Sequence, residues 1–362
     1  MKTVYLYDYL GIHSGCHYYN NAFRDRILER GIPALVLSNY AAQGEAAPFL
    51  LNQYRGNKIQ KVLSLLKNLC RIRRFVRLHP TDVHVILSYG NWVDILFFRA
   101  VSRATLKMVD VHEAVAMSLD GNRYARACLS WAYRHYVDTV IVHSPRTKEI
   151  LDSYGFPGTR LQVPHFRYSF PKMVAEENVA GEVSAVRVDG LVNILFFGNL
   201  SKSKGVDILV EAVNALPPEQ AKKLNIIIAG RDQDGTISRL VLAQDRNWHL
   251  IIRRLNDDEM TSLFSSCDYV ALPYRITSQS GILEMAAYFR KPVLLSDIPY
   301  FRGFLAEFPS FGRLTDISDF ARTLAGLPDD QDTYYAAADC DRFDFRSEVD
   351  SFLDAFAAWM ER

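Results

Sequence analysis

Two glycine-containing segments of the sequence have the composition of loops that bind phosphate groups. The first covers residues 8–17, Asp-Tyr-Leu-Gly-Ile-His-Ser-Gly-Cys-His, after a predicted strand and at a helix predicted to begin near Cys16. Gly11 and Gly15 permit a tight turn, and the free amide groups at a helix N-terminus attract an anionic ligand. The spacing differs from G-x-G-x-x-G, so an ordinary strand-to-helix turn is the alternative.

The second segment covers residues 197–209, Phe-Gly-Asn-Leu-Ser-Lys-Ser-Lys-Gly-Val-Asp-Ile-Leu, and adds two cations to the same pattern. Lys202 and Lys204 are positioned for charge-assisted hydrogen bonds to a diphosphate. The order G-x-x-x-x-G-K-[ST] is missing from this segment, which disfavours a kinase or an ATPase. Two surface lysines in a loop are the alternative.

A third segment, residues 272–297, combines a buried strand, a loop of small polar residues and a helix predicted to begin at 279–281. The amides of Ser280 and Gly281 would face a phosphate, and the Glu284 carboxylate could accept paired hydrogen bonds from the hydroxyls of a sugar. A glutamate in the first turn also stabilises a helix by itself, which is the alternative.

The elements that must position these segments follow the alternating pattern of parallel α/β units. Two successive groups of strands are predicted, the first at residues 3–7, 34–37, 83–87, 106–111 and 139–143 and the second at 192–197, 225–229, 249–252, 269–272 and 293–295. Two open parallel sheets in tandem are therefore expected, each binding its ligand at the carboxyl ends of its strands.

The length of 362 residues exceeds the size at which one hydrophobic core keeps growing, so two domains are expected. We place the first at residues 1–170 and the second at 190–340, with a polar linker from about 167 to 190. The final helix, about 346–362, has apolar residues at helical spacing and must pack on one of them. The spacing leaves open whether it returns to the first domain.

Composition indicates a soluble protein of a reducing compartment. The five cysteines are scattered and form no C-x-x-C pair, which argues against a disulfide framework or a zinc site. The N-terminal apolar run predicts a strand instead of a signal peptide, and no apolar run approaches the ~20 residues that span a bilayer. We therefore expect a cytoplasmic protein, with any membrane contact peripheral and at the inner face of the plasma membrane.

The net charge of +1 conceals an asymmetry between the two halves. Residues 1–170 contain 22 Lys and Arg against 12 Asp and Glu, whereas residues 171–362 contain 20 against 29. Much of the excess lies between residues 46 and 81, a stretch without acidic residues. There Lys67, Arg71 and Arg74 share one helical face, with Val62, Leu66, Leu69 and Val76 on the opposite stripe. Such a helix is a candidate for docking on anionic lipid, and a solvated helix face is the alternative.

Three motifs in this order and spacing resemble glycosyltransferase family 4. They are Phe-Gly-Asn-Leu with Lys-Gly-Val-Asp, then Cys-Asp-Tyr-Val-Ala-Leu-Pro-Tyr, then Ser-Gly-Ile-Leu-Glu-Met-Ala-Ala followed by Lys-Pro-Val. The resemblance covers nearly the whole chain and is strongest from 192 to 305. It implies a retaining enzyme of GT-B fold, with two Rossmann-like parallel-sheet domains facing across a cleft. The sugar nucleotide would bind mainly the second domain and the acceptor the first.

The resemblance also implies roles for individual residues. Gly15 would lie in the loop near the diphosphate, and His112 would sit by the transferred sugar and the donor phosphate. Lys204 matches the lysine that neutralises the diphosphate, and Glu284 matches the acid that binds the ribose. The donor site would further include Ser280, Gly281 and Ile282.

Two departures from the family pattern concern charge. Asn199 stands where the family has an arginine five positions before the lysine, and Lys202 is a candidate substitute. Ile276 stands at the first position of the usual pattern of Glu, seven residues and Glu, so the carboxylate that often meets the donor sugar is missing. The identity of the donor sugar stays open.

The resemblance predicts a transferase that moves a sugar from a nucleoside diphosphate to a glycan or lipid-linked acceptor in bacterial surface polysaccharide synthesis, such as lipopolysaccharide. We expect no metal, no cofactor and no nucleic-acid partner. His112-Glu113 does not continue to H-E-x-x-H, because residue 116 is Ala. Two alternatives remain: a GT-B nucleotide-sugar epimerase or phosphorylase, and a non-catalytic sugar-nucleotide-binding protein.

Overall fold

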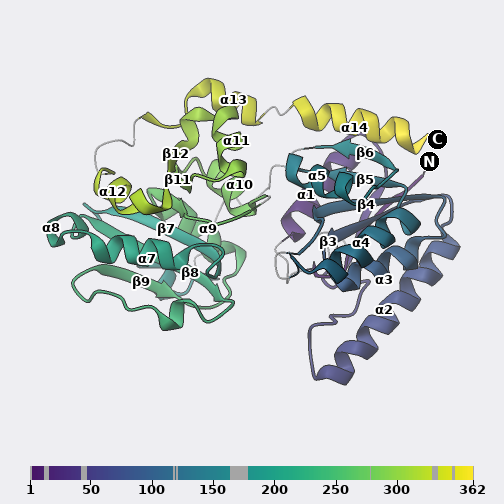
Figure 1. Cartoon of the computed structure of the whole chain (residues 1–362), viewed down its shortest axis with the longest axis horizontal. Helices are drawn as coiled ribbons and strands as arrows, with labels where there is room; N and C mark the ends of the chain where they lie inside the picture. Colours follow the sequence, from purple (N-terminus) through teal and green to yellow (C-terminus); the bar gives the residue numbers. More distant parts are fainter. Residues whose placement is uncertain are drawn as a thin grey trace. The chain divides into compact units, whose positions relative to one another are not determined.

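The computed structural model describes residues 2–11, 16–41, 47–116, 119, 121–163, 178–277, 279–327, 333–344 and 347–361. The chain forms two compact units, residues 1–167 together with 346–362, and residues 168–345. Each unit contains one six-stranded parallel sheet with flanking helices (Figure 1). Gly15, predicted to lie near a phosphate, is outside the described residues.

The first unit has the strand order β2-β1-β3-β4-β5-β6. Its strands are β1 (Val4–Asp8), β2 (Ala34–Ser38), β3 (Val83–Tyr89), β4 (Leu106–Glu113), β5 (Thr139–Val142) and β6 (Thr159–Gln162). Its helices are α1 (His17–Glu29), α2 (Lys58–Leu78), α3 (Trp92–Val101), α4 (Arg123–Tyr136), α5 (Pro145–Ser153) and α14 (Ser347–Met360).

The second unit has the strand order β12-β11-β10-β7-β8-β9. Its strands are β7 (Val192–Leu200), β8 (Leu224–Asp232), β9 (Asn247–Ile251), β10 (Tyr269–Leu272), β11 (Val293–Ser296) and β12 (Gly312–Thr315). Its α-helices are α6 (Gly181–Ser184), α7 (Val206–Ala215), α8 (Pro218–Ala221), α9 (Asp257–Ser266), α10 (Gly281–Tyr288), α11 (Pro299–Glu307), α12 (Phe320–Ala325) and α13 (Ala337–Asp344). The described residues of this unit also include the 3-10 turns η4 (Ile237–Arg239), η5 (Pro309–Phe311) and η6 (Ile317–Asp319).

The apolar runs of the sequence become the central strands of both sheets. All seven residues of β3 and all four of β10 are buried, as expected for strands covered by helices on both faces. Asparagines mark where helices begin: Asn57, Asn91 and Asn122 each accept backbone amide hydrogens at the start of α2, α3 and α4. Local side-chain chemistry therefore fixes the loops at the ends of the sheet.

The ten predicted strands are present with slightly shifted ends, and two further strands, β6 and β12, were not predicted. Both are four-residue edge strands, at the β5 and β11 sides of their sheets. Their sequences, Thr-Arg-Leu-Gln and Gly-Arg-Leu-Thr, lack an apolar run because an edge strand is largely exposed.

The segment predicted as a linker is in part a component of the second unit. Within residues 178–190, Val183 and Val186 are fully buried, and Arg187 forms an ion pair with Asp268 at 3.0 Å. The polar composition concealed this packing because only two apolar side chains anchor the segment.

The final helix, α14, packs on the first unit. Phe352 and Phe356 contact Phe23 of α1, with ring centroids 5.8 and 6.0 Å apart. The indole nitrogen of Trp359 donates a hydrogen bond to Thr139 Oγ1 at 3.0 Å. Among the described helices, none combines the length and the apolar character needed to cross a bilayer.

Candidate functional site

The carboxyl ends of β7 and β10 in the second unit hold the lysine loop in a close backbone contact. Gly205 precedes α7 with a φ of +73°, and a Cβ added there would lie 1.9 Å from the carbonyl oxygen of Pro273. Only glycine tolerates both the left-handed conformation and this approach. The loop that carries Lys202 and Lys204 is therefore fixed against the end of β10.

A second close backbone contact, between Gly230 and Gly198, lies near the start of α10. Gly230 has a φ of +140°, and a Cβ on it would lie 1.8 Å from the carbonyl oxygen of Gly198. A Cβ on Gly198 would lie 3.5 Å from the side chain of Ile282. The first turn of α10 therefore contacts the carboxyl end of β7 directly.

Lys204 is held by an aromatic ring. Its Nζ lies 4.0 Å from the ring centroid of Tyr274, within the range of a cation–π interaction. Burial raises the pKa of Tyr274 to about 12, against a hydrogen bond with Ser280 that lowers it, so the phenol is neutral. Lys204 and Ser280, 76 residues apart in the numbering, therefore contact the same side chain.

Lys202 and Asn199 are exposed at the same edge. The Lys202 amide donates to Asp234 Oδ2 at 3.1 Å, while the Thr236 amide donates to Asp234 Oδ1 at 3.0 Å. Asp234 thus fixes the lysine loop as a turn residue, and a hydrogen bond from the Thr236 hydroxyl is the main cause that lowers its pKa.

Arg275 also stabilises the lysine loop, and the sequence did not single it out. Its guanidinium pairs with both carboxylate oxygens of Asp207, at 2.7 and 2.9 Å, and also donates to the carbonyl of Lys202. The Arg275 amide donates to the Ser203 carbonyl at 3.0 Å. A bidentate pair between residues 68 positions apart has no local sequence signal.

The start of α10 has the predicted arrangement. Ser280 is the N-cap residue, and its hydroxyl accepts a hydrogen bond from the Leu283 amide at 3.3 Å. Gly281 is the first helical residue, and Glu284 is a buried carboxylate in the first turn. Ile276 is exposed in the preceding loop.

His112 lies at the carboxyl end of β4 in the first unit, beside a buried polar cluster. Asp110 Oδ1 lies 2.6 Å from His143 Nε2 and 3.9 Å from His112 Nε2. The Tyr19 hydroxyl donates to Asp110 Oδ2 at 2.8 Å. The His112 ring packs edge-on against Tyr19 and stacks on Tyr89, with centroids 4.6 and 5.8 Å apart.

Burial affects the pKa of His112 and of Asp110 in this cluster. Burial lowers the pKa of His112 to about 4, with Asp110 opposing and His143 adding to the effect, so His112 is neutral at neutral pH. His143 has an oxygen beside each ring nitrogen, Asp110 Oδ1 at 2.6 Å and the Val163 carbonyl at 3.1 Å. Burial raises the Asp110 pKa, but the histidines and hydrogen bonds outweigh it and the net pKa is lowered.

Asp110, His112 and His143 also have ligand atoms within 4.8 Å of one another, a spacing compatible with a metal ion. The same Asp110 carboxylate also lies within hydrogen-bond distance of Tyr19 and His143.

Two further buried carboxylates organise the same edge, and both were missed. Asp8 accepts from the Gly11 amide, Tyr89 hydroxyl and Asn20 side chain, at 2.7, 2.9 and 2.7 Å. Burial raises its pKa to about 6 despite these bonds. An aspartate that ends an apolar strand is a signal that could have revealed it.

Asp94 is the second of these carboxylates. It accepts from the Tyr9 hydroxyl at 2.5 Å and from Ser88 Oγ, the Tyr89 amide and the Asn91 amide at 3.0 to 3.1 Å. Burial raises the Asp94 pKa to about 6 as well. The loop after β3 is thereby attached to β1 and to the start of α3.

The basic helix α2 has the predicted cations on its surface. Lys67, Arg71 and Arg74 are exposed, and Arg71 donates to the Phe49 carbonyl at 3.0 Å. Arg71 and Arg74 border an open groove of about 760 Å³ whose other lining residues are apolar: Leu35, Leu37, Ala47, Pro48, Phe49, Phe75 and Leu78. An amphiphilic molecule would match this surface.

The apolar stripe of α2 divides into two parts. Leu69 and Val76 are buried, as a core-facing stripe requires, but Val62 and Leu66 are more than half exposed. Ile59 and Leu63 join them at a spacing of three or four residues. The first half of α2 therefore presents an uncovered apolar stripe beside its cations.

Solved structures match the fold of nearly the whole chain, and a known family matches part of its sequence. Residues 192–330 match the family described as glycosyl transferases group 1. No curated protein sequence matches the chain. Anabaena HepE in complex with UDP-glucose is 15% identical with a TM-score of 0.65, over 99% of this chain and 100% of that chain. The chain has a GT-B fold.

Two further structures share the GT-B fold. Sucrose-phosphate synthase from Thermosynechococcus elongatus is 13% identical, with a TM-score of 0.67, over 99% of this chain and 100% of that chain. A UDP-forming trehalose-phosphate synthase from Burkholderia xenovorans is 11% identical, with a TM-score of 0.65, over 100% and 99% of the two chains. The predicted α/β class and the resemblance to glycosyltransferases are confirmed.

Proposed function

We propose that the protein is a retaining glycosyltransferase that moves a sugar from a nucleoside diphosphate to a glycan or lipid-linked acceptor in bacterial surface polysaccharide synthesis. The observation that carries the proposal is the position of Lys204. It lies on a loop fixed by Gly205, against Tyr274, which shares a hydrogen bond with the N-cap residue of α10. A lysine and a helix N-terminus together favour a diphosphate.

The chemistry requires positive potential at the departing diphosphate. In transfer with retention the acceptor hydroxyl attacks from the face that the nucleotide leaves, and the leaving phosphate takes the proton. Lys204, with Lys202 nearby, stabilises the charge that develops on that phosphate. The chain supplies position and charge without an enzyme nucleophile, a metal or a cofactor.

His112 is suited to a neutral contact with the sugar. Because burial holds its pKa at about 4, its ring offers hydrogen bonds without charge. We propose that His112 positions the transferred sugar and that Glu284 binds the ribose of the donor. Asn199, Gly281 and Ile282 border the same donor site.

The donor is proposed to be a nucleoside diphosphate sugar of the kind bound in Anabaena HepE, which was solved with UDP-glucose. Ile276 replaces a carboxylate at the sugar end of the site, so the chain's preference among sugars is set by other groups.

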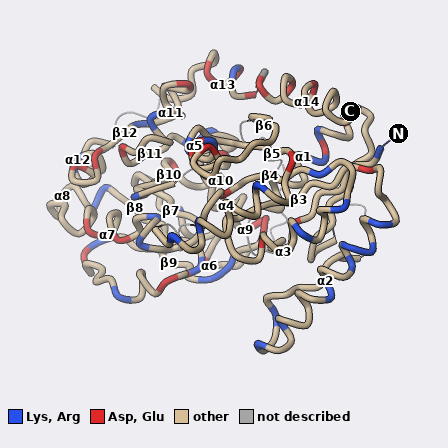
Figure 2. Tube along the Cα trace, turned by 45° about the vertical axis from the view of Figure 1, so that its right-hand side comes forward, with Lys and Arg blue, Asp and Glu red and all other residues tan. Residues whose placement is uncertain are grey.

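The acceptor side is proposed to involve α2. Blue residues follow this helix in Figure 2, and its first half carries the exposed stripe of Ile59, Val62, Leu63 and Leu66. Apolar side chains beside cations suit an anionic lipid surface. We place the protein in the cytoplasm, in peripheral contact with the inner face of the membrane, and assign Lys67, Arg71 and Arg74 to that contact.

The test is a panel of nucleotide sugars scored by thermal shift, followed by a transfer assay with the best donor. Lys204→Ala is expected to lower kcat by roughly 10²–10³ without changing Tm, because it removes one stabilising contact of the transition state. Lys223→Ala, an exposed lysine on the same unit, is the control and should retain full activity. Equal activity of the Lys204→Ala and Lys223→Ala variants would contradict the proposal.

Product stereochemistry separates the proposal from its alternatives. The anomeric configuration of the product, measured by NMR, should match that of the donor. An epimerase would instead convert the donor without any acceptor. Ile276 favours the second alternative, a non-catalytic sugar-nucleotide-binding protein, which would show donor binding with neither transfer nor hydrolysis.

A further inference from the structure

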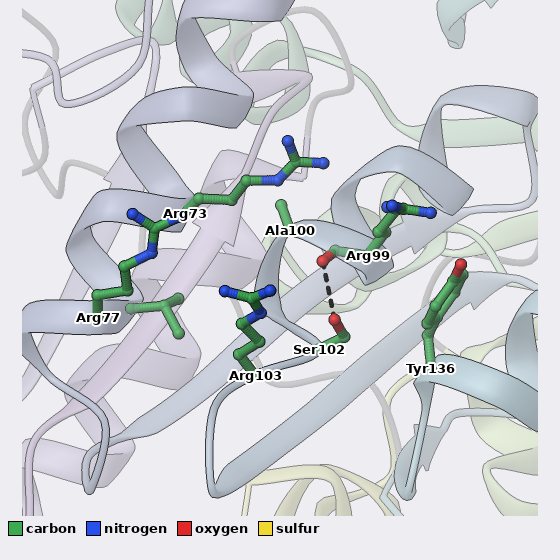
Figure 3. Close-up of a pocket in the computed structure, with 8 residues that line it drawn as sticks. Arg73, Arg77, Arg99, Ala100, Ser102, Arg103 and Tyr136 are labelled. Atoms are coloured by element: carbon green, nitrogen blue, oxygen red, sulfur yellow. Dashed lines mark hydrogen bonds between the residues drawn. The ribbon is translucent and has the colours of Figure 1, made fainter.

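A second basic site lies in the first unit, at the opposite end of the sheet from His112. A cavity of about 440 Å³ is lined by Arg73, Val76, Arg77, Arg99, Ala100, Ser102, Arg103 and Tyr136. Figure 3 shows the four arginines arranged around one space, two on α2 and two at the end of α3. We call this cavity the arginine pocket.

The topology places the arginine pocket away from the proposed sugar-nucleotide site. Its lining residues come from the ends of α2, α3 and α4, just before β3, β4 and β5 begin. His112 lies at the other end of β4, a strand of 8 residues. At a rise of roughly 3.3 Å per residue, the two ends of β4 are about 23 Å apart. The arginine pocket is therefore a separate site.

Helix dipoles explain only part of this arrangement. Arg77 and Arg99 lie in the last turns of α2 and α3, where a cation is favourable. Arg73 is one turn earlier, and Arg103 lies beyond the end of α3. Two of the four cations therefore have no role in stabilising a helix end.

The charge of the pocket is not compensated by the described part of the chain. No Asp or Glu is among its lining residues, and none of the four guanidinium groups forms an ion pair with a described residue. The Ser102 hydroxyl donates to the Arg99 carbonyl at 2.9 Å (Figure 3) and leaves the guanidinium uninvolved. Four like charges around one space favour a multiply charged anion as their partner.

We propose that the arginine pocket binds a phosphate or diphosphate group. Guanidinium groups match phosphate oxygens in geometry and retain their charge at any physiological pH. The volume is that of a small-molecule site, and Val76 and Ala100 give it an apolar wall beside the cations. A phosphate monoester or diphosphate, either soluble or on a lipid headgroup, supplies the required charge in that space. The assignment does not rest on the proposed glycosyl transfer.

The first experiment titrates the full-length protein with inorganic pyrophosphate at constant chloride concentration, by calorimetry. The pocket variant is Arg73→Ala with Arg103→Ala, and the control is Arg123→Ala with Arg134→Ala, two exposed arginines of α4 that do not line the pocket. The two variants change net charge equally. We expect the pocket variant to weaken pyrophosphate binding at least tenfold and the control to change it less than twofold.

Stability distinguishes a ligand site from a structural one. Removal of two cations from an uncompensated cluster should leave Tm equal to or above that of the wild type without anion, and should abolish most of the rise in Tm that pyrophosphate causes. Pyrophosphate also suits the site at Lys204, so equal affinity for the wild type and the pocket variant would overturn the proposal.

The source of the phosphate is decided with vesicles. Phosphatidylcholine vesicles that contain phosphatidic acid present a phosphate monoester, whereas those with phosphatidylglycerol present a diester. Loss of co-sedimentation with phosphatidic acid alone in the pocket variant would assign a lipid headgroup. Loss of pyrophosphate binding with unchanged co-sedimentation on both vesicles would assign a soluble ligand. No binding of either probe by the wild type would overturn the proposal.

Discussion

The carboxyl edges of the two sheets are built from opposite chemistry. In the first unit this edge holds three buried carboxylates, Asp8, Asp94 and Asp110, each surrounded by hydrogen-bond donors. In the second unit it holds glycines in close backbone contact and a lysine over a ring. One edge is made rigid by polar side chains and the other by backbone fit.

This difference shows how one type of sheet supports two kinds of surface. A buried carboxylate with several donors fixes loops by side-chain hydrogen bonds, and its negative charge is satisfied internally. A glycine turn fixes a loop through backbone fit, without buried carboxylates.

The largest effect should come from Gly205→Ala. The added methyl would meet the Pro273 carbonyl in a residue of positive φ, so we expect the free energy of unfolding to fall by about 3 kcal/mol and donor binding to be lost. Gly235→Ala is the control, since Gly235 also has positive φ but its nearest neighbour, Ser238 Oγ, is 3.7 Å away. It should cost about 1 kcal/mol in urea denaturation. Similar losses of stability in the two variants would show that the close contact of Gly205 with Pro273 does not stabilise this edge.

The pH dependence of stability should come next, through His112. Its pKa is about 4 in the folded protein, against an ordinary histidine value of 6.5, so the unfolded chain takes up the proton first as pH falls. The contribution of neutral His112 to the free energy of unfolding is complete above about pH 6.5. It is lost as pH falls to about 4, a change of roughly 3 kcal/mol. Asp8 and Asp94, with pKa raised to about 6, act in the opposite sense.

A comparison of variants isolates the histidine. His112→Asn should remove the histidine's loss, so between pH 6.5 and 4 its free energy of unfolding, measured in urea, should change in the stabilising direction relative to the wild type. His135→Asn, at an exposed position on α4, should leave the profile unchanged. Parallel profiles for the wild type and His112→Asn would mean that the polar cluster does not hold this ring neutral.

The next effect in size should come from Asp94→Asn, which tests whether a buried carboxylate stabilises the carboxyl edge of the first sheet. One oxygen of Asp94 accepts hydrogen bonds from Ser88 Oγ, the Tyr89 amide and the Asn91 amide. In the variant an NH₂ group replaces one of the two carboxylate oxygens, so a hydrogen-bond donor would face other donors. We expect a loss of about 2 kcal/mol in the free energy of unfolding. Asp245→Asn, at an exposed position, should change it by less than about 0.5 kcal/mol. An unaffected Asp94→Asn would mean that this carboxylate does not fix the loop.

Arg275→Lys should have the smallest effect on stability. Lysine keeps the charge but loses the bidentate contact with Asp207, so we expect a loss of about 0.5 kcal/mol and a rise of about threefold in KM for the donor. Arg302→Lys removes the similar pair with Asp297 on the same unit. It should match the stability change and leave KM alone. If both variants had the same KM for the donor, the pair of Arg275 with Asp207 would have no role in positioning the lysine loop.

The motif residues of the second unit were predictable because their signals are local. Glycines beside lysines, and a serine that precedes an apolar helix, specify a turn and an N-cap within a few positions of the chain. Lys204, Ser280, Gly281 and Glu284 accordingly lie where the sequence placed them relative to their own strands and helices. Edge strands β6 and β12 were missed because exposure removes the apolar run that marks a strand.

The sequence by itself determined the two groups of parallel strands, the glycine turns and the basic character of α2, since each depends on neighbouring residues. Only the tertiary structure decided which distant side chains meet. Asp110 pairs with His143, Arg275 with Asp207, and Arg73 joins Arg103 in the arginine pocket. These contacts depend on strand order and helix packing, which bring together residues that no spacing along the chain relates.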